Sequence, residues 1–320
     1  MDTTRESFLA QAATSPVVAV TRSLFADSET PMGLYRKFAG GPGSFLLESA
    51  DQAGKWSRYS FVGVSAHGIL SEQDGRSAWI DLGMGSEEAF GGAMPESTLE
   101  ALEALNARWA SPSTRDIAPF VGGCVGYIGW DAIREIERLE QPPRTVHAVP
   151  RMSMALTKDL IIVDHHTSDV ILVALVHRHS GATDEDFDDA LARLDQMHDI
   201  LRQPTASTLS RRVEPQMHHG RPNMSEAEFL EMVDKAKVHI TDGDVFQVVL
   251  SQRFDLECTA SALEVYRVLR ALNPSPYMYL LECPGTQGQP FHVVGSSPEA
   301  LVTVKNDRVY SHPIAGSRPR

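Results

Sequence analysis

The sequence has 320 residues, of which 42% are hydrophobic and 22% charged, so it is long enough for one large or two medium globular domains. Its 29 Lys and Arg against 42 Asp and Glu give a net charge of −13, which argues against nucleic acid as a partner. Cys124, Cys258 and Cys283 form no CxxC pair, which is typical of a reducing compartment. The longest early apolar run, residues 17–20, is too short for a signal or membrane segment, so we expect a cytoplasmic protein with no membrane partner.

The chain up to residue 203 reads as strands mixed with a few helices. Residues 44–81 carry aromatic and β-branched runs separated by polar and glycine clusters, which predicts antiparallel strands. Apolar spacing predicts a helix over residues 96–110, and "DAIREIERLE" (131–140) predicts another. Two apolar runs within residues 154–179, joined by a turn, predict a β-hairpin, and a further helix begins at about Thr183.

A polar, proline-bearing and aperiodic stretch divides the chain. We interpret residues 204–223 as a linker between a region 1–203 and a second region 224–320. The second region opens with a Ser225-x-x-Glu228 capping box and a helix that ends at Gly243, then continues with a strand predicted over residues 245–257, one more helix and hairpin strands. Because strands and helices do not alternate regularly, the predicted fold class is α+β, with antiparallel sheets flanked by helices.

Histidine pairs and glycine clusters first suggest metal or phosphate sites. The pairs at 165–166, 177/179 and 218–219 lack the third and fourth ligands that a zinc site needs, so we interpret them as turn and linker histidines. "GGCVG" (122–126) and "GGPGS" (40–44) lack the lysine and the strand-to-helix context of a phosphate loop. The sequence therefore predicts no metal or phosphate site in these segments.

Three other stretches favour a binding site, although two of them have a plainer interpretation. "FLLES" (45–49) ends an apolar strand with a carboxylate and a hydroxyl, which also fits a strand end that meets solvent. "NPSPYMYLLE" (273–282) holds an aromatic and a thioether at a rigid turn, which suits an apolar pocket or simple core packing. "GDVFQVVLSQRF" (243–254) places polar side chains on one face of a predicted strand, which suggests a lined cavity.

Taken together and in order, the motifs resemble those of anthranilate synthase component I, a chorismate-utilising enzyme of tryptophan biosynthesis. The resemblance covers roughly residues 30–320 and rests on "LLES", "RYSFVG", "GGCVGYIGWDAIRE", "GDVFQVVLSQRF", "NPSPYMYLL", "GSSPEALV" and "PIAGSRPR". In that family the last motif continues into the rest of the catalytic domain. The resemblance therefore implies a fold that is incomplete at the C-terminus, with the catalytic residues and the Mg²⁺ ligands beyond Arg320 and none of the metal ligands in this chain.

The resemblance also implies an activity. The family adds ammonia, supplied from glutamine by a glutamine amidotransferase partner, to chorismate and releases pyruvate and anthranilate. Gly316 and Ser317 match the positions that approach the substrate, with Ser317 in place of the usual Thr, whereas the roles of Arg318 and Arg320 are less defined. Relatives that make aminodeoxychorismate carry a nucleophilic Lys where this sequence has Ala315, so the alternative of aminodeoxychorismate synthase component I is disfavoured.

A second implied site is regulatory. In the family, the LLES and NPSPYM motifs form a pocket for tryptophan, the feedback inhibitor, since an ammonium needs oxygen acceptors and an indole needs an apolar slot. The residues that match this inhibitor site are Leu47, Glu48, Ser49, Arg58, Pro276, Tyr277 and Met278.

The 320-residue chain itself is expected to be inactive alone. The alternative from another functional class is a non-catalytic chain that binds tryptophan or a glutaminase.

Overall fold

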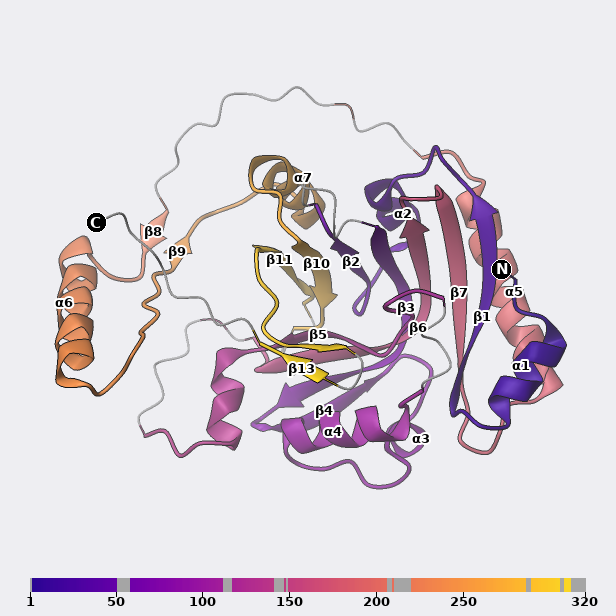
Figure 1. Cartoon of the computed structure of the whole chain (residues 1–320), viewed down its shortest axis with the longest axis horizontal. Helices are drawn as coiled ribbons and strands as arrows, with labels where there is room; N and C mark the ends of the chain where they lie inside the picture. The colour runs from indigo at the N-terminus through magenta and orange to yellow at the C-terminus, as the bar shows by residue number, and fades with distance from the viewer. Residues whose placement is uncertain are drawn as a thin grey trace. The chain divides into compact units, whose positions relative to one another are not determined.

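A computed structural model describes most of the chain (Figure 1). The described residues are 2–50, 58–111, 117–140, 147, 149–205, 209, 220–285, 289–305 and 308–311. Two compact units emerge: Met1–Ala206 with Ala262–Glu299, and Ser207–Ser261 with Ala300–Arg320. Each compact unit thus combines segments that are separated in the sequence. The predicted linker at residues 204–223 stays a prediction.

One antiparallel sheet of nine strands organises the first unit. Its strand order is β1-β7-β6-β3-β2-β10-β11, with β4 paired to β3 and β5 paired to β6. The strands are β1 (Val17–Phe25), β2 (Phe45–Glu48), β3 (Tyr59–Gln73), β4 (Arg76–Asp81), β5 (Cys124–Ile128), β6 (Met152–Asp164), β7 (Asp169–His177), β10 (Tyr277–Cys283) and β11 (Phe291–Ser297). All of these pairings are antiparallel, and with the flanking helices they confirm the predicted α+β class.

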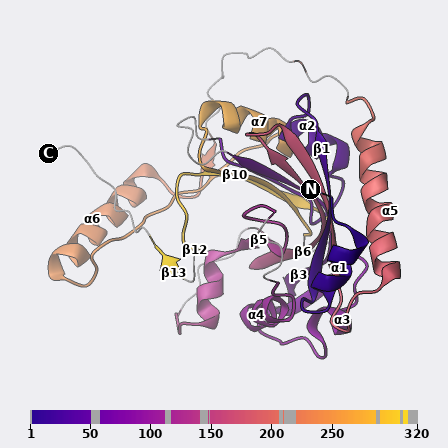
Figure 2. The same ribbon diagram turned by 45° about the vertical axis from the view of Figure 1, so that its right-hand side comes forward.

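Helices cover both faces of this sheet because strand side chains alternate between the two faces. Val18 and Val20 of β1 join a core with α1 (Arg5–Ala12), α2 (Pro31–Phe38), α5 (Asp184–Leu201) and α7 (Ala262–Leu272). Figure 2 shows α5 along the outer side of β1. The intervening residues of β1 join a second core with α3 (Ser86–Phe90) and α4 (Thr98–Arg108). Within the part of the chain that the structure describes, no helix is long and apolar enough to cross a lipid bilayer.

Elements with strong local signals form as predicted. The hairpin is β6 and β7, with Asp164 paired to Asp169 across the turn. Helix α5 begins after Thr183, whose side chain and that of Asp186 make a reciprocal capping box. These predictions are confirmed.

The second unit contains little sheet and one long helix. Helix α6 (Glu226–Asp242) has the predicted Ser225–Glu228 capping box and ends at Gly243 in the left-handed conformation, with φ of 85°. None of its 17 residues is buried. The strands of this unit form two short pairs, namely β8 (Arg221–Pro222) with β9 (Phe254–Asp255), and β12 (Thr303–Lys305) with β13 (Arg308–Tyr310).

Two sequence predictions were wrong. The strand predicted over residues 245–257 exists only at Phe254–Asp255, because residues 245–253 find no partner strand within the described part of the chain. The helix predicted over residues 131–140 is instead a short 3-10 turn, η1 (Trp130–Glu135). A strand needs inter-strand hydrogen bonds, and side-chain pattern alone does not supply them.

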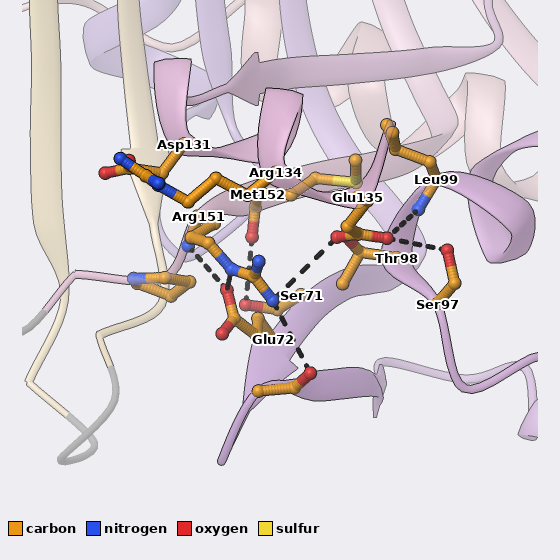
Figure 3. A network of polar contacts seen from close by, with 12 residues as sticks. Ser71, Glu72, Ser97, Thr98, Leu99, Asp131, Arg134, Glu135, Arg151 and Met152 are labelled. Carbon is orange, nitrogen blue, oxygen red and sulfur yellow. Dashed lines mark hydrogen bonds and ion pairs between the residues drawn. The ribbon is translucent and has the colours of Figure 1, made fainter. Parts of the chain in front are cut away.

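The 3-10 turn η1 is held by a polar network at the start of α4 (Figure 3). The Glu135 carboxylate accepts hydrogen bonds from the Ser97 hydroxyl at 2.6 Å, from the Thr98 hydroxyl and from the Leu99 N–H at 3.4 Å. A negative charge at a helix N-terminus is favoured because unpaired N–H groups and the helix dipole concentrate positive charge there. Glu135 therefore ties η1 to α4.

Arg151 extends this network to the sheet (Figure 3). Its Nε and its backbone N–H both donate to Glu72 Oε2, at 2.8 and 3.0 Å, and its Nη2 lies 3.8 Å from Glu135 Oε1. Burial alone would raise the pKa of Glu135. The hydrogen bonds from Ser97, Thr98 and Leu99 and the charge of Arg151 outweigh burial and hold that pKa below its ordinary value.

We predict that Glu135→Gln lowers the free energy of unfolding by about 1.5–3 kcal/mol at pH 7, the usual loss for hydrogen bonds to a charged group. Because the folded-state pKa is depressed, the contribution of Glu135 is present above the unfolded value near 4.5 and is lost as pH falls through the folded pKa. Urea unfolding at pH 7 and at pH 3 measures both effects. The difference between wild type and variant is expected to shrink at pH 3.

Asp131→Asn serves as the control for that measurement. Asp131 pairs with Arg134 three residues away, but its side chain is 47% exposed. We expect a change within about 0.5 kcal/mol, since exposed ion pairs contribute little. Equal effects of the two substitutions would contradict the role assigned to Glu135.

A second prediction concerns α6. Helix α5 buries five side chains, whereas α6 buries none. Because most helical stability in proteins comes from packing, we expect amide hydrogens of α6 to exchange much faster than those of α5. Hydrogen–deuterium exchange with mass spectrometry tests this, and similar protection in the two helices would show that the apolar stripe of α6 is covered in solution.

Candidate functional site

A buried carboxylate ends strand β2. Glu48 is 5% exposed, and the preceding Phe45 and Leu46 are 2% and 0% exposed. Because β2 lies between β3 and β10, Glu48 is opposite Ser60 on one side and Met278 on the other. The interpretation of "FLLES" as a strand end that meets solvent is therefore wrong. A buried carboxylate is costly unless hydrogen bonds or opposite charges compensate it.

Helix α7 supplies that compensation. The Tyr266 hydroxyl donates to Glu48 Oε2 at 2.6 Å, and Arg270 Nε lies 3.1 Å from the same oxygen. The two residues are one helical turn apart, so they face the same way. Burial raises the pKa of Tyr266, and the nearby Glu48 charge raises it further, so the phenol stays protonated as a donor.

The compensation leaves two polar atoms unsatisfied. Arg270 Nε is close enough to Glu48 for an ion pair but is misaligned for a hydrogen bond, and it is buried without another partner. The Ser49 hydroxyl, next along the chain, is also buried and has no hydrogen-bond partner among the described residues. An unsatisfied buried polar group costs about 1–3 kcal/mol, so Arg270 Nε beside the Glu48 carboxylate, with Ser49 next along the chain, marks a place where a ligand's polar groups would be stabilised.

The carboxylate itself has spare capacity. Both contacts from α7 involve Oε2, and among the described residues no hydrogen bond to Oε1 of Glu48 is found. An ionised carboxylate can accept about four hydrogen bonds. The site thus offers an acceptor in Glu48, a cationic donor in Arg270 and a hydroxyl in Ser49.

Arg58, a predicted inhibitor-site residue, is already engaged by Asp164. The guanidinium binds the carboxylate in a fork, with Nε 3.1 Å from Oδ1 and Nη2 2.8 Å from Oδ2. This contact chiefly lowers the pKa of Asp164, which stays ionised. The Arg58 guanidinium also lies over the Tyr59 ring, 4.7 Å from its centroid. Arg58 therefore lies at the start of β3, fixed by Asp164 and Tyr59.

His165 was interpreted as a turn histidine, but it lies near this site. Its Nε2 is 2.8 Å from the Ser60 hydroxyl, and Ser60 is opposite Glu48 in the sheet. Burial lowers the pKa of His165, and Arg270 lowers it further, although Glu48 opposes the shift. A neutral His165 avoids a second positive charge beside Arg270.

The NPSPYM motif reaches the same place from β10. Met278 is 1% exposed and lies opposite Glu48, while Tyr277 is 44% exposed at the start of the strand and Pro276 is half-buried before it. The two predicted motifs thus lie on neighbouring strands of one unit. The structure pairs Glu48 with Met278 across the two strands, and Ser49, Pro276 and Tyr277 adjoin this pair along the chain, whereas Leu47 is opposite Tyr279 and packs in another cluster.

Tyr266 and Arg270 were not predicted as site residues. Helix α7 has a clear apolar stripe, and Tyr266 belongs to it at 0% exposure. One sequence signal could have indicated a buried polar site here, namely an Arg four residues after a tyrosine on a core-facing stripe. A buried phenol and a nearby cation both need a polar partner. That signal does not name the partner, which is 218 residues away from Tyr266 in the sequence.

The predicted substrate motif cannot be placed. Ala315, Gly316, Ser317, Arg318 and Arg320 all lie outside the residues that the structure describes. Among residues that it does describe, no group of three or more His, Cys, Asp or Glu side chains is arranged to hold a metal ion. The described residues therefore do not fit a Mg²⁺ site, and no chemical step is assigned to a metal here.

Comparison with known proteins identifies the family to which the chain is similar. The model of the chorismate binding enzyme family matches residues 45–320. Anthranilate synthase component 1 from Mycolicibacterium smegmatis is 44% identical, with 99% of this chain and 60% of the relative covered. The protein of that name from Mycobacterium tuberculosis is 42% identical, with 99% and 62% covered.

A solved structure supports the fold. Anthranilate synthase component I from Streptococcus pneumoniae superposes with a TM-score of 0.60 over 90% of this chain and 60% of that chain, at 23% identity. The chain spans about 60% of the length of these relatives. Since the family model covers most of the sequence, the chain belongs to the chorismate-binding enzyme family.

Proposed function

We propose that this chain functions in anthranilate synthesis, as the synthase component that combines chorismate with ammonia and releases pyruvate. A glutamine amidotransferase partner would supply the ammonia, Mg²⁺ would be the cofactor, and the location would be cytoplasmic. The family match and the names of the most similar relatives support this proposal. Gly316 and Ser317 would approach the substrate.

Ala315 favours this reaction over the closest alternative. Aminodeoxychorismate synthase component I would use a lysine nucleophile at this position, and Ala315 has no nucleophilic atom. Ammonia would then attack the ring directly. The protein expressed from its own gene, incubated with chorismate, ammonia and Mg²⁺, is expected to form fluorescent anthranilate. Formation of aminodeoxychorismate would contradict the proposal, and tryptophan binding without turnover would favour a non-catalytic chain.

We further propose that the Glu48 site binds tryptophan as a feedback inhibitor. The observation that carries this proposal is Arg270 Nε, which forms no hydrogen bond within the described residues and lies beside the Glu48 carboxylate with its spare oxygen, while the unsatisfied Ser49 Oγ belongs to the next residue. A zwitterionic amino acid matches this set, because its ammonium can donate to Glu48 and Ser49 while its carboxylate accepts from Arg270.

The apolar part of the ligand would contact the NPSPYM segment. Met278 supplies a polarizable thioether, which packs well against aromatic rings, and Tyr277 supplies a partly exposed ring at the edge of the site. Leu47 and Pro276 would complete the apolar contacts. Inhibition would require tryptophan to bind one arrangement of the enzyme more tightly than another.

Ser49→Ala tests this binding role. Since Ser49 Oγ has no partner within the described structure, its removal should leave the free energy of unfolding unchanged or raise it by about 1 kcal/mol. Loss of a hydrogen bond to the charged ammonium should weaken tryptophan binding roughly tenfold. Isothermal titration calorimetry measures the affinity, and urea unfolding measures the stability.

Ser71→Ala is the matched control. Ser71 is a buried serine of β3 whose hydroxyl donates to the Met152 carbonyl at 3.3 Å. This substitution should lower the free energy of unfolding by about 1 kcal/mol and leave tryptophan binding unchanged. If Ser49→Ala behaves like Ser71→Ala in both measurements, Ser49 is a structural residue and the proposed site is wrong.

A further inference from the structure

A cavity of about 200 Å³ lies on the α4 side of the sheet in the first unit. Its inner wall is apolar and buried, whereas Asn106 and Ala110 at its rim are exposed. The buried apolar side chains that line it are Val17, Leu105, Val121, Leu156 and Leu175. This cavity shares no lining residue with the Glu48 site.

Among the described residues that line the cavity, none is Asp, Glu, Lys or Arg. A described cation near this wall is Arg108, whose guanidinium lies over the Trp109 ring, 5.0 Å from its centroid. Burial raises the pKa of the Cys124 thiol to about 12, and burial, with the charges of Arg193 and Arg178, lowers the pKa of His177 to about 3. Both groups are neutral at pH 7. A charged ligand would therefore lose its hydration here without gaining an ion pair.

Aromatic contacts are available at one side of the cavity. The Trp109 ring is 8% exposed and lies edge-on to His177, with ring centroids 5.1 Å apart. Its Nε1 donates to the Ala89 carbonyl at 2.9 Å, which fixes the orientation of the indole. A fixed aromatic ring beside apolar side chains, in a cavity that also exposes polar atoms, favours a flat, aromatic ligand with a polar group.

His177 adds one polar contact. Its Nδ1 is 3.0 Å from His67 Nε2, so these two nitrogens share one hydrogen bond. Within the described residues, the structure gives no hydrogen bond to Nε2 of His177. A neutral imidazole that is bonded at one nitrogen retains the other nitrogen as a donor or acceptor, as the tautomer dictates.

The glycines of "GGCVG" form an open wall. Gly122 and Gly123 have φ of 149° and 122°, which other residues rarely adopt. A Cβ at Gly122 would lie 2.3 Å from Leu175 Cδ1, whereas a Cβ at Gly123 would meet no atom within 4 Å. The Gly123 carbonyl accepts from the Thr157 N–H at 2.9 Å and anchors the segment to β6. These glycines leave space at the wall of a neutral cavity.

We propose that this cavity binds a small uncharged aromatic molecule that carries one hydrogen-bonding group, such as a phenol or an aryl alcohol. An apolar cavity of roughly 150 Å³ is enough for benzene, so the volume here suits one substituted ring. The ring packs against Trp109 and the apolar wall, and the hydroxyl bonds to His177. The charged site at Glu48 requires a different class of ligand.

Methyl-labelled protein and NMR spectroscopy test the proposal with phenol and benzyl alcohol as probes and benzoate as the charged comparison. Saturable shifts are expected for the methyl groups of Val121 and Leu175 with both neutral probes and not with benzoate. No shift at millimolar concentrations of the neutral probes would overturn the proposal. Equal binding of benzoate would overturn the assignment to uncharged ligands.

Variants at the rim give an independent test. Asn106→Trp and Ala110→Trp replace exposed rim residues with bulky side chains and should weaken phenol binding at least about tenfold. Ala107→Trp is the matched control, since Ala107 is exposed on the same helix and does not line the cavity. Unchanged phenol affinity in both rim variants, or an equal loss of affinity in the Ala107→Trp control, would contradict binding in this cavity. Two rim positions are used so that the test still works if one variant is unstable.

Discussion

The buried carboxylate of Glu48 is the constraint on which the first unit depends. A charge at the end of a core strand is tolerated only with a donor and a cation close by, and α7 supplies Tyr266 and Arg270 from 218 or more residues along the chain. That requirement fixes α7 above β2, and β10 follows α7 directly into the sheet beside β2. Compensation of the Glu48 charge therefore links α7 and β10, which are distant in the sequence, to the N-terminal strands of the sheet.

Glu48 and Glu135 are both carboxylates that need hydrogen bonds and a nearby cation, but they differ in how completely these are supplied. The Glu135 carboxylate receives three hydrogen bonds at the start of α4 and lies near Arg151, and no atom of this network is left unsatisfied among the described residues. Around Glu48, within the part of the chain that the structure describes, an oxygen is spare, and Arg270 Nε and the hydroxyl of the adjacent Ser49 form no hydrogen bond. A saturated network stabilises the fold by itself, whereas an unsaturated one can be completed by a ligand or by ordered water. This difference separates a structural carboxylate from a candidate binding carboxylate.

The parts of the structure that could be predicted from sequence are those with local causes. The helix start near Thr183, the capping box at Ser225 and the β6–β7 hairpin depend on residues a few positions apart, so pattern alone finds them. The prediction of a strand over residues 245–257 was wrong because strand pairing depends on residues far apart in the sequence. The motif resemblance did indicate Glu48 and Met278. Their neighbours Tyr266, Arg270 and His165 were missed because these contacts are also non-local.

Alternation along the strands separates two chemistries in one sheet. Tyr266 and Met278 pack in the core that α1, α2 and α5 cover, whereas Trp109 and Leu175 pack in the core on the α4 side. Because successive side chains point to opposite faces, the sheet carries the Glu48 and Arg270 charges at the edge of one core and the Trp109 and His177 rings on the other side. A zwitterion is stabilised only where Glu48 and Arg270 are available, and an uncharged ring only where no charge must be desolvated. The electrostatics of the two faces thus select different ligands without any difference in backbone architecture.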